Sequence, residues 1–279
     1  MRILCSTGAV TRHPTRADHR LIAEARDLPC SGFELSIYPT WVDDADRVAV
    51  EVAALGLPIE TAHAEKSVGA RLSEGDRGAV DRLEGSARIA ARAGARLLVL
   101  HLWELPLGDR HVERNLELLP ACADVADAAG LTLGVETIPC SVGSPIANVA
   151  RAIEREPRCV AVLDTEFLAH HGELDEALAA GLPVAHVHVK DYGGELKHGD
   201  PRTRYLLPGE GSLDLDGFLA GLADLGYEGA ATLEASAVDP DGGLDRSRLA
   251  EIARALARLR RATHTRSEEG RGGCDGHTS

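Results

Sequence analysis

Short apolar runs alternate with longer amphipathic segments along most of the chain. Each run is rich in Val, Leu and Ala and is too short for a helix, so it indicates a buried parallel strand. The predicted strands are 2–6, 32–37, 59–63, 97–101, 132–136, 160–164, 184–189 and 230–234. The segments between them carry apolar residues at helical spacing and often end in glycine. The clearest predicted helices are 73–93, 112–129, 215–225 and 245–261.

Eight such units favour a (β/α)8 TIM barrel, in which parallel strands close into a ring surrounded by helices. The length of 279 residues suits this fold, because barrels of about 250 residues commonly form one domain. A doubly wound sheet is the alternative, but CSTGAV after the first run lacks the G-x-G-x-x-G pattern of dinucleotide-binding sheets. We predict one barrel over residues 1–262. The polar segment 263–279 has no apolar period, which predicts a disordered tail.

Composition and charge narrow the class of protein further. The formal charge of −14, from 44 acidic and 30 basic residues, argues against a nucleic-acid partner, which would call for a basic surface. No apolar run approaches the 18 residues of a membrane span, and MRILCSTGAV lacks a signal-peptide core, so we expect a cytoplasmic protein without a membrane partner. The six cysteines form no C-x-x-C pair, which predicts reduced and mostly buried thiols.

Four predicted strands end in a residue that can bind a metal ion. Glu136 closes LTLGVE, Asp164 closes CVAVLD, and Glu234 closes GAATLE, while His188 lies in VAHVHVKD. In a closed parallel barrel the C-terminal strand ends meet on one face, so these residues are expected to converge there. Carboxylates with one imidazole suit one divalent ion, with Mn²⁺ or Mg²⁺ favoured and Co²⁺ or Zn²⁺ compatible. The alternative is that each acid only caps a strand or a helix.

Other polar and aromatic residues are expected at the same rim. Alternation along a strand points His186 and His188 to the same side, so spacing alone does not choose between them as ligands. The predicted substrate contacts are His63, Glu65, His101, Trp103, Lys190 and Tyr205. Aromatic faces with a few polar groups suit a small carbohydrate-like partner. A homo-oligomer is compatible with the sequence, which does not fix the oligomeric state.

The order of these motifs resembles the xylose isomerase-like barrel family, which includes sugar phosphate isomerases and epimerases, inosose dehydratases and AP endonucleases. The matching segments are VET (135–137), LDT (163–165), HVHVKD (186–191), PGEGSLD (208–214) and GYEGAATLE (226–234). The resemblance covers nearly the whole chain. It implies metal ligation by Glu136, Asp164, His188 and Glu234. It also implies that His188 is the ligand and His186 a buried neighbour.

The chain departs from this family at two positions. Where members commonly place a histidine three residues after the sixth-strand Asp, this chain has Phe167. Where AP endonucleases carry an Asp-x-His that binds further zinc, it has Thr203, Arg204 and Tyr205. Without those ligands a trinuclear zinc site cannot assemble, so a function in DNA repair is less favoured. A non-catalytic carbohydrate-binding barrel is also less favoured, because binding alone needs no complete metal set.

These residues together predict an enzyme that enolises a small polyhydroxylated carbonyl compound, such as a sugar, keto acid or cyclitol. A divalent ion would act as a Lewis acid and stabilise an enediolate. Glu136 and Glu234 would remove and return a proton as catalytic acids and bases. Return to the neighbouring carbon gives isomerisation, and return to the opposite face gives epimerisation. Loss of a β-substituent would instead give a metal-dependent lyase or dehydratase, including cleavage of a C-glycoside, which is the alternative.

Overall fold

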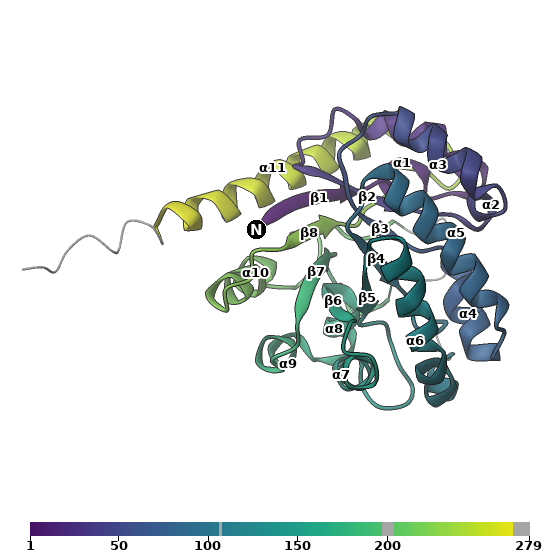
Figure 1. Cartoon of the computed structure of the whole chain (residues 1–279). Coiled ribbons are helices and arrows are strands. Elements are labelled where there is room, and N and C mark those ends of the chain that lie inside the picture. Colours follow the sequence, from purple (N-terminus) through teal and green to yellow (C-terminus); the bar gives the residue numbers. More distant parts are fainter. Residues whose placement is uncertain (106–107, 197–203, 270–279) are drawn as a thin grey trace, which may run out of the picture.

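Eight parallel strands close into a barrel in which each strand pairs with its neighbours in chain order and β1 pairs with β8 (Figure 1). This arrangement was obtained as a computed structural model that describes residues 1–105, 108–196 and 204–269, with residues 264–269 described by their backbone alone. The strands are β1 (Arg2–Ser6), β2 (Gly32–Ser36), β3 (Ile59–His63), β4 (Leu97–Leu100), β5 (Thr132–Glu136), β6 (Val160–Asp164), β7 (Val184–Val189) and β8 (Ala230–Leu233). The predicted (β/α)8 barrel is therefore confirmed, with every strand within one residue of its expected bounds.

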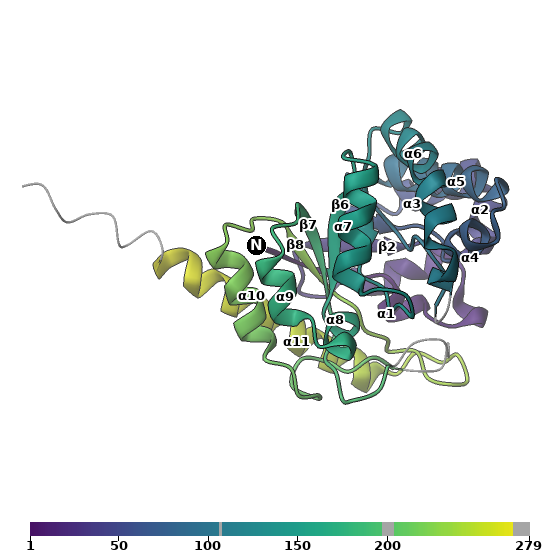
Figure 2. The same cartoon turned by 90° about the horizontal axis from the view of Figure 1, so that it is seen from below.

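The helices surround the strands on the outside of the barrel (Figures 1 and 2). The α-helices are α1 (Gly8–Thr11), α2 (Pro39–Val42), α3 (Ala45–Ala54), α4 (Ser67–Glu74), α5 (Gly78–Ala93), α6 (Val112–Ala128), α7 (Pro145–Arg155), α8 (Thr165–His171), α9 (Leu174–Ala179), α10 (Leu215–Asp224) and α11 (Arg246–Glu269). Three short 3₁₀ helices are η1 (Pro14–Arg16), η2 (His19–Ala25) and η3 (Gly108–His111). Within the described ranges no helix is long and apolar enough to cross a membrane.

One predicted helix is divided in the structure. The segment 73–93 was predicted as one continuous helix, but its first residue, Ser73, lies inside α4. Gly75 ends that helix with a φ of +74°, a left-handed conformation that favours glycine. The Asp76 carboxylate then accepts a hydrogen bond from Gly78 N at 2.8 Å, where α5 begins. The glycine that ends α5, Gly94, has a φ of +98° as its position before a strand predicted.

The last helix is longer than the sequence indicated. Its apolar face, formed by Ile252, Leu256 and Leu259, is buried against the barrel core as expected. However, α11 continues to Glu269 and extends beyond the barrel (Figure 1). The helix therefore includes the first seven residues of the segment 263–279 that was predicted to be a tail. The rest of the predicted tail, residues 270–279, lies outside the described residues.

Strand alternation divides the side chains between two environments. In β7, Val187 and Val189 belong to the apolar core between strands and helices, so His186 and His188 point into the barrel. A small separate apolar cluster of Leu97, Val99 and Val162 also lies apart from that outer core. The barrel interior thus contains this small apolar cluster. It carries buried acids and histidines toward its C-terminal end, where the candidate site is found.

Candidate functional site

The centre of the site is a buried cluster formed by the C-terminal ends of three neighbouring strands. Glu136 ends β5, Asp164 ends β6, and His188 lies near the end of β7. His188 Nδ1 lies 2.7 Å from Glu136 Oε1 and 3.9 Å from Asp164 Oδ2. All three side chains are almost completely buried. One potential ligand atom from each lies within 4.8 Å of the others, so the three can hold a metal ion.

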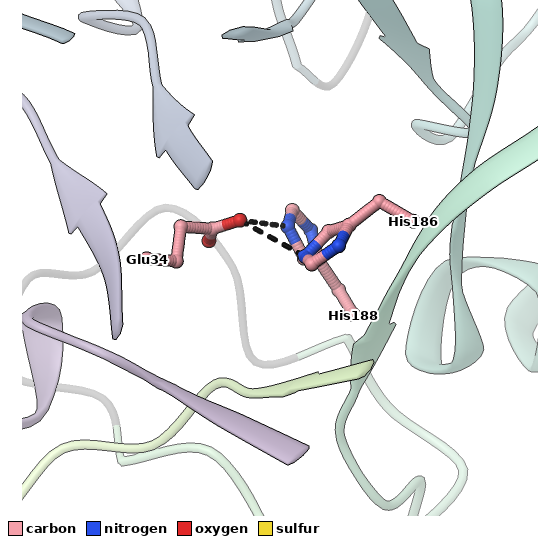
Figure 3. A group of neighbouring side chains, drawn as sticks. All are labelled: Glu34, His186 and His188. Carbon is pink, nitrogen blue, oxygen red and sulfur yellow. Dashed lines mark hydrogen bonds and ion pairs between the residues drawn. The ribbon is translucent and has the colours of Figure 1, made fainter. Parts of the chain in front are cut away.

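Glu34, from β2 on the other side of the barrel, contacts the second nitrogen of His188 (Figure 3). Its Oε2 lies 3.0 Å from His188 Nε2 and 3.1 Å from His186 Nε2. Burial alone would lower the pKa of His188, but the carboxylates of Glu34 and Glu136 raise it well above its ordinary value. A proton on Nε2 that is donated to Glu34 leaves Nδ1 as the nitrogen that can bind an ion between Glu136 and Asp164.

Two further histidines contact the other oxygen of Glu136. His63 Nε2 lies 3.1 Å and His101 Nε2 lies 2.7 Å from Glu136 Oε2. These residues form a second group that can hold a metal ion, and it shares Glu136 with the first. Burial lowers the pKa of His101 to about 3, so its imidazole is neutral and able to act as a ligand. The structure thus places His63 and His101, two of the predicted substrate contacts, beside the cluster.

Lys190 links the cluster to Glu234, which follows β8. Its Nζ lies 2.5 Å from Asp164 Oδ2 and 2.8 Å from Glu234 Oε2, with only 1% of the side chain exposed. Burial alone would lower the pKa of Lys190, but Asp164 and Glu234 raise it well above its ordinary value. Glu234 therefore does not belong to any of the compact ligand groups in the described part of the chain; an ammonium group separates it from Asp164.

The donor chemistry of this cluster fits a divalent cation. Burial raises the pKa of Asp164 to about 7 although Lys190 opposes the shift, and the nearby Glu136 carboxylate adds to it. The cluster therefore holds carboxyl groups close to one another in a buried environment. Carboxylate oxygens and one imidazole are ligands that Mn²⁺ and Mg²⁺ accept, and Co²⁺ or Zn²⁺ can also use them.

Two predicted substrate contacts point elsewhere. Glu65 accepts hydrogen bonds from Ser67 and also pairs with Arg82, outside the metal-ligand groups. Trp103 is completely buried, and its indole N–H donates to the Pro139 carbonyl at 3.1 Å. The expectation that Trp103 offers an aromatic face to a substrate is therefore wrong, because its ring packs in the core.

Tyr205 and Phe167 lie beside the cluster, at the positions where multi-zinc relatives would place histidines. Lys190 Nζ is 4.3 Å from the centre of the Phe167 ring and 4.6 Å from that of Tyr205. These aromatic faces stabilise the buried ammonium group. Thr203, which was aligned with the same family motif, lies outside the described residues.

Other residues of the family motifs have structural roles. The Asp191 carboxylate accepts hydrogen bonds from the backbone N–H groups of Gly209, Gly211 and Leu213 at 2.8–3.0 Å, so it holds the P-G-x-G turn. The Tyr227 hydroxyl lies 2.7 Å from the Ala230 carbonyl, where it fixes the start of β8. These motifs therefore shape the loops around the site without forming it.

Sequence reasoning gave Glu34 no role in the site and missed Arg12. Glu34 is an acid inside an apolar strand, a signal of a buried partner, but its contact with His188 depends on the closure of the barrel. Arg12 follows α1 and reaches Glu234, with its Nη2 3.4 Å from Glu234 Oε1. Its sequence context, CSTGAVTRH, gives no sign of that contact.

Comparison with known proteins agrees with this description. The profile of the xylose isomerase-like TIM barrel family matches residues 22–262, so the chain belongs to this family. The predicted family resemblance is confirmed. A comparison with curated protein sequences gives no match.

Several solved structures share the fold. A D-tagatose 3-epimerase-like protein superposes with a TM-score of 0.69 at 18% identity, covering 96% of this chain and 99% of that one. D-allulose 3-epimerase from Methylomonas sp., in complex with D-allulose, superposes with a TM-score of 0.70 at 16% identity, covering 94% of this chain and 97% of that one. 3-Keto-D-glucoside 4-epimerase from E. coli superposes with a TM-score of 0.60 at 18% identity, covering 93% of this chain and 99% of that one. At these identities the similarity establishes the fold alone.

Proposed function

We propose that this protein is a divalent-metal-dependent isomerase or epimerase of a small polyhydroxylated carbonyl compound. The observation that carries the proposal is the buried cluster of Glu136, Asp164 and His188 at the C-terminal ends of β5 to β7. In TIM barrels this face is where enzymes carry out their chemistry. The fold shared with several sugar epimerases supports the same class of reaction.

Glu136, Asp164 and His188 would hold the ion. Glu234 would be the fourth ligand if the Lys190 ammonium group, which now lies between Glu234 and Asp164, moves aside. Bound there, a divalent ion would stabilise the negative charge that develops on neighbouring substrate oxygens. Mn²⁺ and Mg²⁺ are the preferred ions for so many carboxylate oxygens.

Glu136 and Glu234 would carry out the proton transfers. Burial would raise the pKa of each, but His188 and His101 hold that of Glu136 well below its ordinary range, and Lys190 and Arg12 do the same for Glu234. Both carboxylates are therefore ionised at neutral pH and able to accept a proton from a carbon next to a carbonyl group. Since Glu136 ends β5 and Glu234 follows β8, they can face a substrate from two sides, which epimerisation requires.

The proposal is tested by incubating the Mn²⁺-loaded protein in D₂O with D-fructose, D-tagatose, D-allulose and an inosose. NMR should show deuterium at the carbon next to the carbonyl group of at least one compound, together with its isomer or epimer. His188→Ala protein is the control and should give neither. If no compound in the panel exchanges a proton under these conditions, the proposal fails. An unsaturated product would instead identify a dehydratase.

The same site argues against action on DNA. Phe167 and Tyr205 pack their rings against Lys190, so neither position supplies a further metal ligand. We therefore expect no incision of an abasic-site oligonucleotide by the Mn²⁺- or Zn²⁺-loaded protein, which a gel assay with a known AP endonuclease as positive control would check.

A further inference from the structure

Arg12 lies at the rim of the site, and among the described residues most of its hydrogen-bonding capacity is unused. It follows α1, directly after β1, and only 16% of its side chain is exposed. Its guanidinium carries five N–H donors. In the described parts of the chain the only group that these donors reach is Glu234 Oε1, at 3.4 Å from Nη2. That distance is long for a bond between charged groups, which usually measure about 2.7–2.9 Å.

The position of the guanidinium is nevertheless well defined. Its carbon Cζ lies 4.3 Å from the centre of the Tyr205 ring, which fixes the plane without using an N–H donor. Gly8 provides room on another side, because a Cβ at residue 8 would lie 3.2 Å from Arg12 Nη2. Arg12 is thus held in place by packing while its donors stay available.

Arginines with a structural role in this protein look different. Arg158 donates to Asp124, Asp127 and Glu156 at 2.7–2.9 Å. Arg88 pairs with Asp46 at 2.9 Å and with Glu84 at 3.2 Å. Arg12, although far less exposed than either of them, has one long contact. Stability of the fold therefore does not explain its placement.

The local charges indicate what Arg12 binds. Glu234 is shared by two cations, since Lys190 Nζ contacts its Oε2 while Arg12 faces Oε1. Lys190 also lies over the Tyr205 ring that supports Arg12. One carboxylate cannot satisfy both cations and also take part in holding a divalent ion. If Glu234 binds a divalent ion, Arg12 loses the one carboxylate that it contacts among the described residues. Its planar fork of N–H groups then suits two oxygens of one anionic group.

From this geometry we infer that the substrate carries a carboxylate or phosphate group that Arg12 binds. This group lies next to the carbon whose proton Glu234 removes or returns. This inference rests on the proposed function and narrows its substrate class to anionic carbonyl sugars. Because Arg12 and Glu234 are in contact, the anionic group lies close to the reacting part of the substrate.

Matched pairs of compounds test the inference by isothermal titration calorimetry in the presence of Mn²⁺. 2-Keto-D-gluconate and D-fructose 1-phosphate, which carry the anionic group on C1 beside the C2 carbonyl, are each compared with D-fructose, and the two acids separate a carboxylate site from a phosphate site. Wild-type protein should bind at least one of the two acids about tenfold or more tightly than D-fructose. Arg12→Met should remove that preference, Arg12→Lys should keep part of it, and Arg88→Met, an exposed control, should keep all of it. Circular dichroism shows whether each variant is folded.

Equal affinity of the wild-type protein for D-fructose and both acids would overturn the inference, and so would an undiminished preference in folded Arg12→Met and Arg12→Lys. Proton exchange in D₂O separates this result from failure of the proposed function. Exchange with neutral ketoses that is independent of Arg12 would retain the function and reject the inference. Arg12-dependent binding of an acid without exchange of any compound would support the anion site and reject the proposed reaction.

Discussion

Lys190 and Asp164 form a buried ion pair, with Lys190 Nζ 2.5 Å from Asp164 Oδ2. The ammonium group also contacts Glu234, so one cation of the chain lies between two of the proposed metal ligands. A divalent ion bound by both carboxylates would take the place of this ammonium group. Lys190 and the metal therefore compete for the same negative charge.

Replacing Lys190 by methionine keeps an unbranched side chain, shorter by one atom, but removes its charge. We expect the affinity for Mn²⁺ to rise about tenfold, or ~1.4 kcal/mol, because the competing cation is gone. The metal-free variant should be less stable than wild type by about 3 kcal/mol, since breaking a buried ion pair leaves uncompensated carboxylates. Calorimetry and urea denaturation with EDTA measure the two effects. Arg88→Met, at an exposed arginine on α5, is the control, and a weaker affinity in Lys190→Met would show that Lys190 orients the ligands instead.

His188→Ala removes the imidazole of the cluster. Metal content measured by elemental analysis should fall from about one divalent ion per chain by an order of magnitude, because three ligands of high charge cannot replace the missing nitrogen. The barrel should still fold, because His188 points to the rim end of its interior and the apolar core lies outside the strands. His170→Ala, on α8, should leave the metal content unchanged. Wild-type occupancy in His188→Ala would remove His188 from the ligand set.

Glu34→Gln tests the contact that orients His188. Glu34 Oε2 accepts the Nε2 proton of His188 at 3.0 Å and so directs Nδ1 toward Glu136. Residues that orient metal-binding histidines in this way commonly contribute about 10–100-fold to metal affinity. We expect a loss of that size in a Mn²⁺ titration, with Glu60→Gln, at a partly exposed residue that pairs with Arg2, as the control. Unchanged affinity would show that Glu136 alone holds the ring.

Glu136→Gln and Glu234→Gln test the proton transfers. Each variant should lose about 10²–10⁴-fold in turnover, because an amide cannot accept the substrate proton. Metal content must be measured in parallel to separate loss of the ion from loss of the base. Glu228→Gln, at an exposed residue before β8, should retain full activity. Substantial turnover by both variants would assign the proton transfer to another residue of the rim, such as His63.

Thiol reactivity follows from the burial of the cysteines. Burial raises the pKa of Cys122 to about 12, and it also raises those of Cys5 and Cys159. Alkylation requires the thiolate, so at pH 8 Cys122 should be alkylated roughly 10³-fold or more slowly in the folded protein than in the unfolded chain. The alkylation rate of the folded protein should still be rising at pH 10. Iodoacetamide labelling with peptide mapping, with and without guanidinium, measures this ratio. Rapid labelling of Cys122 in the folded protein would contradict the burial.

The strands and their ends were predictable because their signals are local. Five or six apolar residues bounded by glycine-containing turns indicate a buried strand, and the closed parallel barrel then requires the C-terminal ends to meet. Glu136, Asp164 and His188 could therefore be brought together without coordinates. The predicted helix 73–93 failed for an equally local reason, because Gly75 ends a helix where a periodic pattern alone suggests continuity.

By itself, then, the sequence determined the barrel, the face that carries the site and most of the acids and imidazoles on it. Only the tertiary structure decided which of these side chains are in contact. Glu34 and His188 lie 154 residues apart, and Arg12 and Glu234 lie 222 apart. Their contacts depend on strand register and barrel closure, to which local periodicity is insensitive. For the same reason Trp103, which follows a rim strand like its neighbours, turned out to be a core residue, since packing rather than chain position sets its exposure.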